Sequence, residues 1–147
     1  MTLASHTVRL DIGSEFDMLD FVEVVCSHMS KMVGFDEDAL HWISIAVRES
    51  VANAMKHGNK GDESKRVKVE FTTSPADHPS ELVILVRDQG EGFDPDAVAD
   101  PLAPENLLKS SGRGIFLIRS FMDDVALRRM PEGGMEVRMV KRLAAAS

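Results

Sequence analysis

Two oxygen-bearing side chains, those of Glu49 and Asn53, lie four residues apart in a mostly apolar stretch of the sequence. If that stretch is helical, residues four apart share one face, and their side chains can converge on one point. An asparagine offers a neutral oxygen to Mg²⁺, which keeps several waters and takes its other ligands from phosphates. A glutamate can accept a proton from water or a hydroxyl group. Taken alone, the pair is explained more simply as part of a solvated helix face.

A second group of residues, Asp88, Gly90 and Gly92, follows an apolar segment in the order Asp-Gln-Gly-Glu-Gly. An ionised carboxylate only accepts hydrogen bonds, so it suits an exocyclic amine such as that of adenine. Glycines permit positive φ and let the backbone approach a planar ligand closely. The motif is short enough to occur by chance, and an ordinary polar turn also explains it.

A third group precedes a segment that should form a helix from about Ile115. Exposed amides at a helix N-terminus attract phosphate, and glycine lets the chain wrap around it. Two cations in this group could add charge-assisted contacts to a polyphosphate. An ordinary capped helix start, with a serine as the cap, is the competing explanation. The residues are Lys109, Ser111, Gly112, Arg113 and Gly114.

Two common nucleotide-binding signatures are missing from the sequence. No Gly-x-x-x-x-Gly-Lys-Ser/Thr occurs, which excludes a P-loop. The glycines at 112 and 114 are followed by Leu117, where the dinucleotide fingerprint has glycine or alanine. A nucleotide site in this chain therefore has to be of another kind.

Composition predicts one globular domain over residues 1–147, with 44% hydrophobic and 28% charged residues. A net charge of −7 disfavours direct binding to nucleic acid. The single cysteine, Cys26, excludes an internal disulfide. Because the sequence has neither a signal-like start nor an apolar stretch of about 18 residues, we expect a cytoplasmic protein with no membrane partner.

Periodicity predicts a two-layer α/β sandwich with a mixed, mostly antiparallel sheet and helices on one face. Ser14 and Asp36 are the expected N-caps of the first two helices. Between the last two motifs, residues 93–111 read as a lid over a ligand, because a segment this long without clear periodicity is uncommon in a compact domain. The expected strands are 8–12, 67–71, 82–86 (central), 125–130 and 135–140, and the expected helices are 14–33, 36–58 and 115–122.

The three groups, taken in order, resemble the N-box, G1 box and G2 box of the GHKL (Bergerat-fold) ATP-binding superfamily. The stretch Ala46–Gly58 is similar to the N-box of one branch, the anti-sigma factor serine/threonine-protein kinases. Gly112–Val125, with Phe-Met-Asp near its end, supports the same branch. The resemblance covers roughly residues 8–140, nearly the whole chain.

The resemblance implies that ATP and Mg²⁺ are cofactors, with Asn53 as the Mg²⁺ ligand and Asp88 on the adenine amine. Gly90 and Gly92 would line the base and ribose, the third group would meet the phosphates, and Glu49 would be the general base. Such kinases phosphorylate a STAS-type antagonist, hold a sigma factor inactive in a partner switch, and form homodimers. Two alternatives remain: a binding module that uses ATP only structurally, and the detached ATP-binding half of a histidine kinase.

Overall fold

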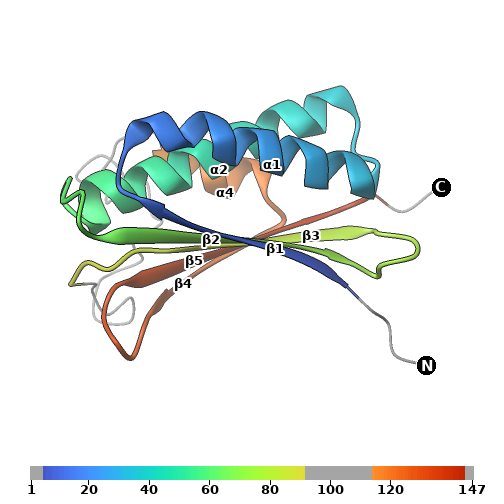
Figure 1. Cartoon of the computed structure of the whole chain (residues 1–147). Helices are drawn as coiled ribbons and strands as arrows, with labels where there is room; N and C mark the ends of the chain where they lie inside the picture. The colour runs from blue at the N-terminus through green and yellow to red at the C-terminus, as the bar shows by residue number, and fades with distance from the viewer. Residues whose placement is uncertain (1–4, 92–113, 145–147) are drawn as a thin grey trace.

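The computed structural model describes residues 5–91 and 114–144, which form a five-stranded sheet with helices on one face (Figure 1). The strand order is β1-β2-β3-β5-β4, with β3 in the centre as expected, and all four ladders are antiparallel. This is the predicted two-layer α/β sandwich. In chain order the elements are β1 (His6–Gly13), α1 (Leu19–Val33), α2 (Glu37–Asn53), η2 (Ala54–Gly58), β2 (Arg66–Ser74), β3 (Glu81–Arg87), α4 (Gly114–Phe121), β4 (Asp124–Arg129) and β5 (Met135–Arg142).

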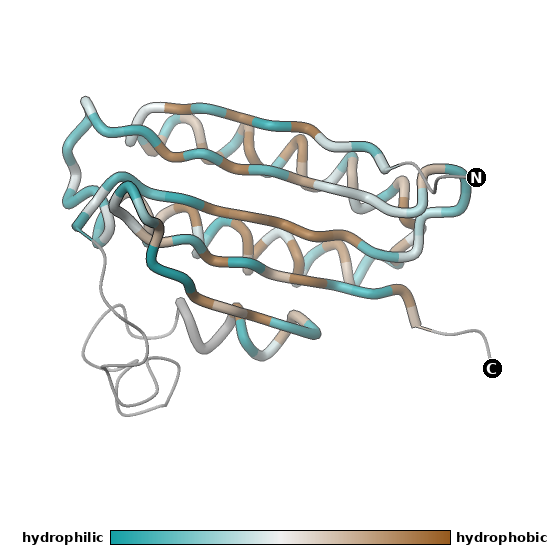
Figure 2. The backbone as a smooth tube through the Cα atoms, turned by 90° about the horizontal axis from the view of Figure 1, so that it is seen from below, coloured by the Kyte–Doolittle hydropathy of each residue, from teal (hydrophilic) through white to brown (hydrophobic). Residues whose placement is uncertain are grey.

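The strands follow from a period of two in the sequence, because alternate side chains of a strand point to opposite faces of the sheet. In β2, Val67, Val69 and Phe71 are buried beneath the helices, and in β3 the buried side chains are those of Leu82, Ile84 and Val86. Figure 2 shows hydrophobic residues along the strands and hydrophilic ones in the connecting turns. The sheet's inner face is thereby fixed against α1 and α2.

The two predicted N-caps have different outcomes. The Asp36 carboxylate accepts a hydrogen bond from Ala39 N at 2.8 Å, so the cap of α2 is confirmed. The Ser14 prediction is wrong: a short 3₁₀ turn, Phe16–Met18, precedes α1, and the Ser14 hydroxyl donates to Lys65 O at 2.9 Å. Ser14 lies between the end of β1 and the 3₁₀ turn, where its hydroxyl bonds a partner distant in sequence and caps no helix.

Helix α2 is the central helix of the layer, with α1 on one side and α4 on the other (Figure 1). Ile43, Val47 and Val51 on its lower face are fully buried. After Asn53 the chain continues for one π-helical turn, η2, to Gly58, where the helix was expected to end. This extra turn brings the chain to the C-terminal end of β3, where Gly58 lies against Asp88.

Candidate functional site

Glu49 and Asn53 lie one turn apart on α2, and both are half-buried. Two turns before Glu49, the Trp42 ring stacks on Phe121 of α4, with centroids 4.2 Å apart and planes at 14°. Residues seven apart share a side of a helix. Glu49 therefore lies on the side of α2 that faces α4 rather than α1.

The side-chain amide of Asn53 has an unused hydrogen-bonding group. Its Nδ2 is buried and has no hydrogen-bond partner among the described residues. Leaving a buried polar group unpaired costs about 1–3 kcal/mol, so such a group is unusual in a folded protein. The amide is therefore a candidate for contact with a ligand.

Arg48 precedes Glu49 in the sequence but is bound elsewhere. Its guanidinium donates to Glu23 at 3.0 Å and to Asp20 at 3.3 Å, both on α1. The hydrogen bond to Glu23, and then that to Asp20, raises the pKa of Arg48 above its ordinary value. Its charge is directed to α1, whereas Glu49 lies on the side of α2 that faces α4.

The carboxylate of Asp88, directly after β3, is held by backbone groups on one of its two oxygens. Oδ1 accepts hydrogen bonds from Gly90 N at 3.0 Å and from Met135 N at 3.1 Å. The Asp88 amide in turn donates to Met135 O at 3.1 Å. Oδ2 accepts no hydrogen bond from the described residues. The carboxylate is thus oriented by one oxygen and keeps the other as an acceptor.

Three glycines surround Asp88 so closely that none of them has room for a side chain. A Cβ on Gly58 would lie 2.8 Å from Asp88 Cβ and would overlap the carboxylate. A Cβ on Gly134 would overlap the Asp88 carbonyl, and one on Gly90 would overlap the carbonyl of Gly58. We call these three residues the glycine cradle.

The cradle corrects one expectation about Gly90. Positive φ was a reason offered for this glycine, but in the described residues the glycines with positive φ are Gly34, Gly61, Gly133 and Gly134. Gly90 is a glycine because its Cα packs against the backbone of Gly58. Its contact is with the protein's own helix end.

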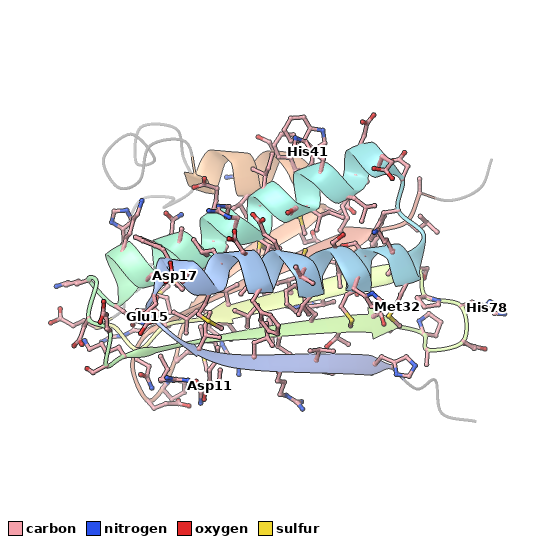
Figure 3. The ribbon with its side chains drawn as sticks, turned by 45° about the horizontal axis from the view of Figure 1, so that its top comes forward. Asp11, Glu15, Asp17, Met32, His41 and His78 are labelled. Atoms are coloured by element: carbon pink, nitrogen blue, oxygen red, sulfur yellow. The ribbon has the colours of Figure 1, made fainter. Side chains whose placement is uncertain are left out.

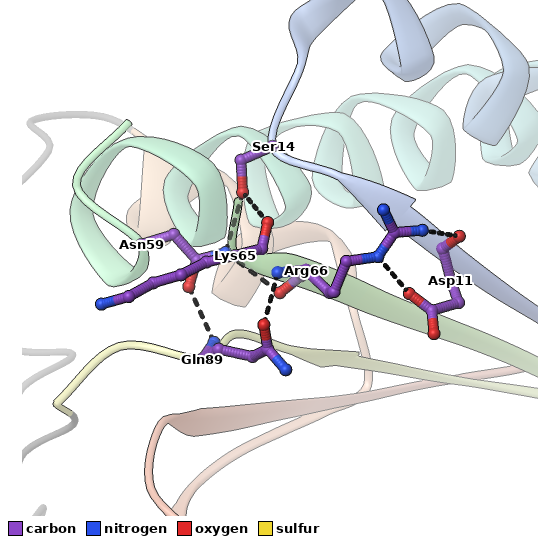
Figure 4. Close-up of polar contacts among 6 residues, drawn as sticks. All are labelled: Asp11, Ser14, Asn59, Lys65, Arg66 and Gln89. Atoms are coloured by element: carbon purple, nitrogen blue, oxygen red, sulfur yellow. Dashed lines mark hydrogen bonds and ion pairs between the residues drawn. The ribbon is translucent and has the colours of Figure 1, made fainter. Parts of the chain in front are cut away.

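Sequence reasoning missed Asn59, which is fully buried at the junction of four elements (Figure 4). Its Nδ2 donates to Ser14 Oγ at 2.9 Å and to Arg66 O at 3.0 Å, and its Oδ1 accepts from Gln89 N at 2.7 Å. The sequence places Asn59 in a polar turn, where asparagine is ordinary. No local pattern distinguishes a buried asparagine from an exposed one there.

Several predicted site residues fall outside the part of the chain that the structure describes. The lid at 93–111 and five residues of the site prediction lie outside the described residues, while Gly114 is the first residue of α4. The predictions for their roles therefore stay predictions. The five are Gly92, Lys109, Ser111, Gly112 and Arg113.

A shallow groove of about 760 Å³ lies between residues 14–17, which precede α1, and η2 with the turn after it, and its lining contains none of the predicted site residues. Glu15 and Asp17, which line it, are seen near the C-terminal end of α2 in Figure 3, whereas His41 lies in the N-terminal half of that helix. Within the described ranges, no three His, Cys, Asp or Glu side chains form a metal-binding group. None of the described helices is both long and apolar enough to span a bilayer.

Comparisons with known proteins identify the family of this chain. The model of the histidine kinase-like ATPase domain matches residues 18–141. The chain belongs to this family. Its relatives include the serine-protein kinase RsbW of Listeria monocytogenes, 27% identical over 147 residues that cover 96% of this chain and 90% of the relative. Those of Staphylococcus epidermidis (30% over 141 residues, 91% and 84%) and Oceanobacillus iheyensis (24% over 143 residues, 93% and 87%) are similar in extent.

The match of the histidine kinase-like ATPase family confirms the predicted GHKL-type superfamily, and the serine-kinase relatives support the predicted branch within it. The matched range contains α2, with Glu49 and Asn53, and the end of β3, with Asp88. The relatives align along nearly their whole length, so the likeness concerns the complete domain and is not limited to one motif.

Proposed function

We propose that this chain is an ATP-dependent serine/threonine-protein kinase that acts as an anti-sigma regulatory factor. Its substrate would be a STAS-type antagonist, and the same protein would bind a sigma factor in a partner switch. The relatives named serine-protein kinase support phosphoryl transfer to a protein hydroxyl. A homodimer in the cytoplasm, without direct contact to nucleic acid or membrane, completes the proposal.

The observation that carries the proposal is the junction between the end of α2 and the end of β3. Asn53 and Gly58 are five residues apart, or roughly 7 Å along the helical axis at about 1.5 Å per residue. Gly58 packs directly on the Asp88 carboxylate. Among the described residues, a buried Asn53 amide nitrogen without a partner and an Asp88 carboxylate oxygen that accepts no hydrogen bond thus lie at one end of the domain.

These residues fit Mg-ATP in their chemistry. Asp88 Oδ2 is an acceptor that can take the N–H of an exocyclic amine, as adenine requires. The Asn53 amide can supply one neutral oxygen to a cation that takes its remaining ligands from phosphate and water. This is consistent with the lack of a carboxylate or histidine cluster among the described residues. The groups proposed to meet the phosphates are Lys109, Ser111, Gly112, Arg113 and Gly114.

When bound, Mg-ATP would supply the transferable phosphoryl group and the cation that neutralises its charge. Glu49 would accept the proton of the attacking serine or threonine hydroxyl at its carboxylate. Its position on the α4 side of α2, one turn from Asn53, keeps the base near the proposed cation ligand. Phosphoryl transfer depends chiefly on positioning and charge stabilisation, so this set of groups is chemically sufficient.

The test separates chemistry from binding. Purified protein is incubated with γ-labelled ATP, Mg²⁺ and a STAS-type antagonist, and nucleotide affinity is measured in parallel by calorimetry. We expect Glu49→Ala to abolish transfer while leaving ATP affinity within about twofold, because a proton acceptor adds little to ground-state binding. Asn53→Ala should weaken Mg-ATP binding itself.

Matched controls come from the same helix. Arg48→Ala changes the neighbouring residue, whose charge is directed to α1, and should leave ATP affinity unchanged. Intact ATP binding without label transfer in the wild type would refute the kinase and leave an ATP-binding module. Equal turnover in wild type and Glu49→Ala would refute the role of Glu49 as general base.

A further inference from the structure

The polar network around Asn59 joins the end of the long helix to the loop that carries Asp88 (Figure 4). Its members come from four places in the chain: the end of β1, the turn after η2, the start of β2 and the end of β3. Asn59 is at its centre and is 0% exposed. Such a satisfied buried network makes the local arrangement unique, since each unmet bond would carry the full cost of burial.

The contacts between the two segments run in step along the chain. Gly58 covers the carboxylate of Asp88. Asn59, which follows Gly58, accepts a hydrogen bond at its side-chain oxygen from the backbone N–H of Gln89, which follows Asp88, at 2.7 Å. The backbone N–H of Asn59 donates a hydrogen bond to Ala54 O in the preceding helical turn, at 2.8 Å. The position of Gln89 is therefore set by the end of the helix that bears Asn53.

A second bond fixes the same loop from the β2 side. The Gln89 side-chain carbonyl accepts from Arg66 N at 2.6 Å, although Gln89 itself is exposed. The side-chain NH₂ group of Asn59, in contrast, points away from the loop and donates to Ser14 Oγ and to the carbonyl of Arg66. Asn59 thus has one oxygen that holds the loop of Asp88 and one nitrogen that holds the scaffold.

We propose that Asn59 is a positioning residue for base selection: by fixing the backbone at Gln89 it holds Asp88 where its free oxygen accepts an amine and repels a carbonyl. The inference rests on the proposed function, because it takes an adenine nucleotide as the ligand of Asp88. Adenine presents an amine at the position where guanine presents a carbonyl, and a carboxylate accepts from the first only. Loss of Asn59 should therefore reduce selectivity between the two bases as well as affinity.

The experiment measures the affinities of the full chain for non-hydrolysable ATP and GTP analogues, with Mg²⁺, by calorimetry. Asn59→Ala removes the acceptor for Gln89 N, and the ratio of GTP to ATP dissociation constants should fall about five- to tenfold, as expected for one hydrogen bond. Ser14→Ala removes the Ser14 bond to Lys65 O and one of the two acceptors of Asn59 Nδ2, which keeps Arg66 O, and it leaves the bond from Gln89 N to Asn59 Oδ1 in place. That control should lose stability but keep its selectivity within about twofold.

Two further variants keep the result decisive. Asp88→Asn should abolish the preference for ATP, which identifies Asp88 as the selecting group. Gln89→Ala removes the bond to Arg66 N from an exposed position, so it should fold even if Asn59→Ala does not. Its selectivity should fall about two- to threefold, again with Ser14→Ala unchanged.

The failure of this inference differs from failure of the proposed function. A wild-type protein that binds neither analogue overturns both. If wild type prefers ATP and Asp88→Asn abolishes the preference, but Asn59→Ala or Gln89→Ala keeps it, Asn59 is only structural and the inference alone is overturned. An equal loss of selectivity in Ser14→Ala would also overturn it, because the effect would then follow stability and not position.

Discussion

Replacing Gly58 by alanine tests whether the glycine cradle sets the position of Asp88. The added methyl carbon would lie 2.8 Å from Asp88 Cβ and overlap the carboxylate, whereas ordinary carbon contacts begin at about 3.5 Å. The backbone at Gly58 cannot easily move away, because Asn59 N donates to Ala54 O at 2.8 Å and Gly61 N to Met55 O at 2.9 Å. The Asp88 side chain has to move instead.

Moving the carboxylate would break its two backbone hydrogen bonds, from Gly90 N at 3.0 Å and from Met135 N at 3.1 Å. Hydrogen bonds to charged groups contribute about 1.5–3 kcal/mol each, and overpacking costs about 1–3 kcal/mol. Alanine favours helix over glycine by about 1 kcal/mol, which acts in the opposite direction. We therefore expect Gly58→Ala to lower the free energy of unfolding by at least about 3 kcal/mol.

Nucleotide affinity should fall as well, because a displaced Asp88 loses its proposed bond to the adenine amine. One charge-assisted hydrogen bond corresponds to about a 10- to 100-fold weaker dissociation constant for ATP. Urea unfolding gives the stability and calorimetry gives the affinity. Gly13→Ala is the matched control, since its Cβ would have no neighbour closer than 3.7 Å and its φ is not positive.

Three results would contradict the role proposed for the glycine cradle or for Asp88. Wild-type stability in Gly58→Ala would mean that the carboxylate shifts at no cost and that the cradle does not hold it. Reduced stability with unchanged ATP affinity would keep the packing but remove Asp88 from adenine recognition. A similar loss in Gly13→Ala would show that the effect is a general one of glycine replacement.

Three further predictions concern the scaffold. Asp36→Ala should lower the free energy of unfolding by about 1 kcal/mol through loss of the α2 cap, measured in urea. Burial raises the pKa of Cys26 from its ordinary 9.0 to about 12, so the folded state keeps a proton that the unfolded chain releases, and stability should fall by about 1.4 kcal/mol per pH unit between 9 and 12. Unfolding at pH 8 and 10.5 should show this extra loss in wild type and not in Cys26→Ala. Glu136→Gln, which weakens the buried partner of two strand arginines, should cost about 2 kcal/mol by thermal unfolding, and an unchanged melting temperature would refute that ion pair's contribution.

Element types and order followed from the sequence because burial and period agree along most of the chain. The valines and Phe71 of β2 alternate with polar residues, and the buried strand β3 is continuous in apolar residues. The cap at Asp36 was predictable because it depends only on neighbours three residues away. Local physics therefore determined these features, and a single sequence exposes local physics.

Ser14 and Asn59 were not predictable for the opposite reason: their partners are distant in sequence. Ser14 is a typical helix-cap residue, but its hydroxyl donates to Lys65 O and accepts from the Asn59 side-chain amide, 51 and 45 positions away. Asn59 had the composition of a turn. The pairing of polar side chains depends on tertiary contacts that local patterns do not contain.

Gly58 and Gly90 show how the two kinds of information combine at the candidate site. Each glycine was visible in a motif, yet the reason for it was not: their backbones pack against each other, and Gly58 also packs against Asp88. A carboxylate needs a fixed position to select one base over another. The end of η2 at Gly58 is packed against the same residues, Asp88 and Gly90. Because the same contacts hold the carboxylate and the helix end, a substitution at this junction should change stability and selectivity together, whereas Ser14→Ala should change stability alone.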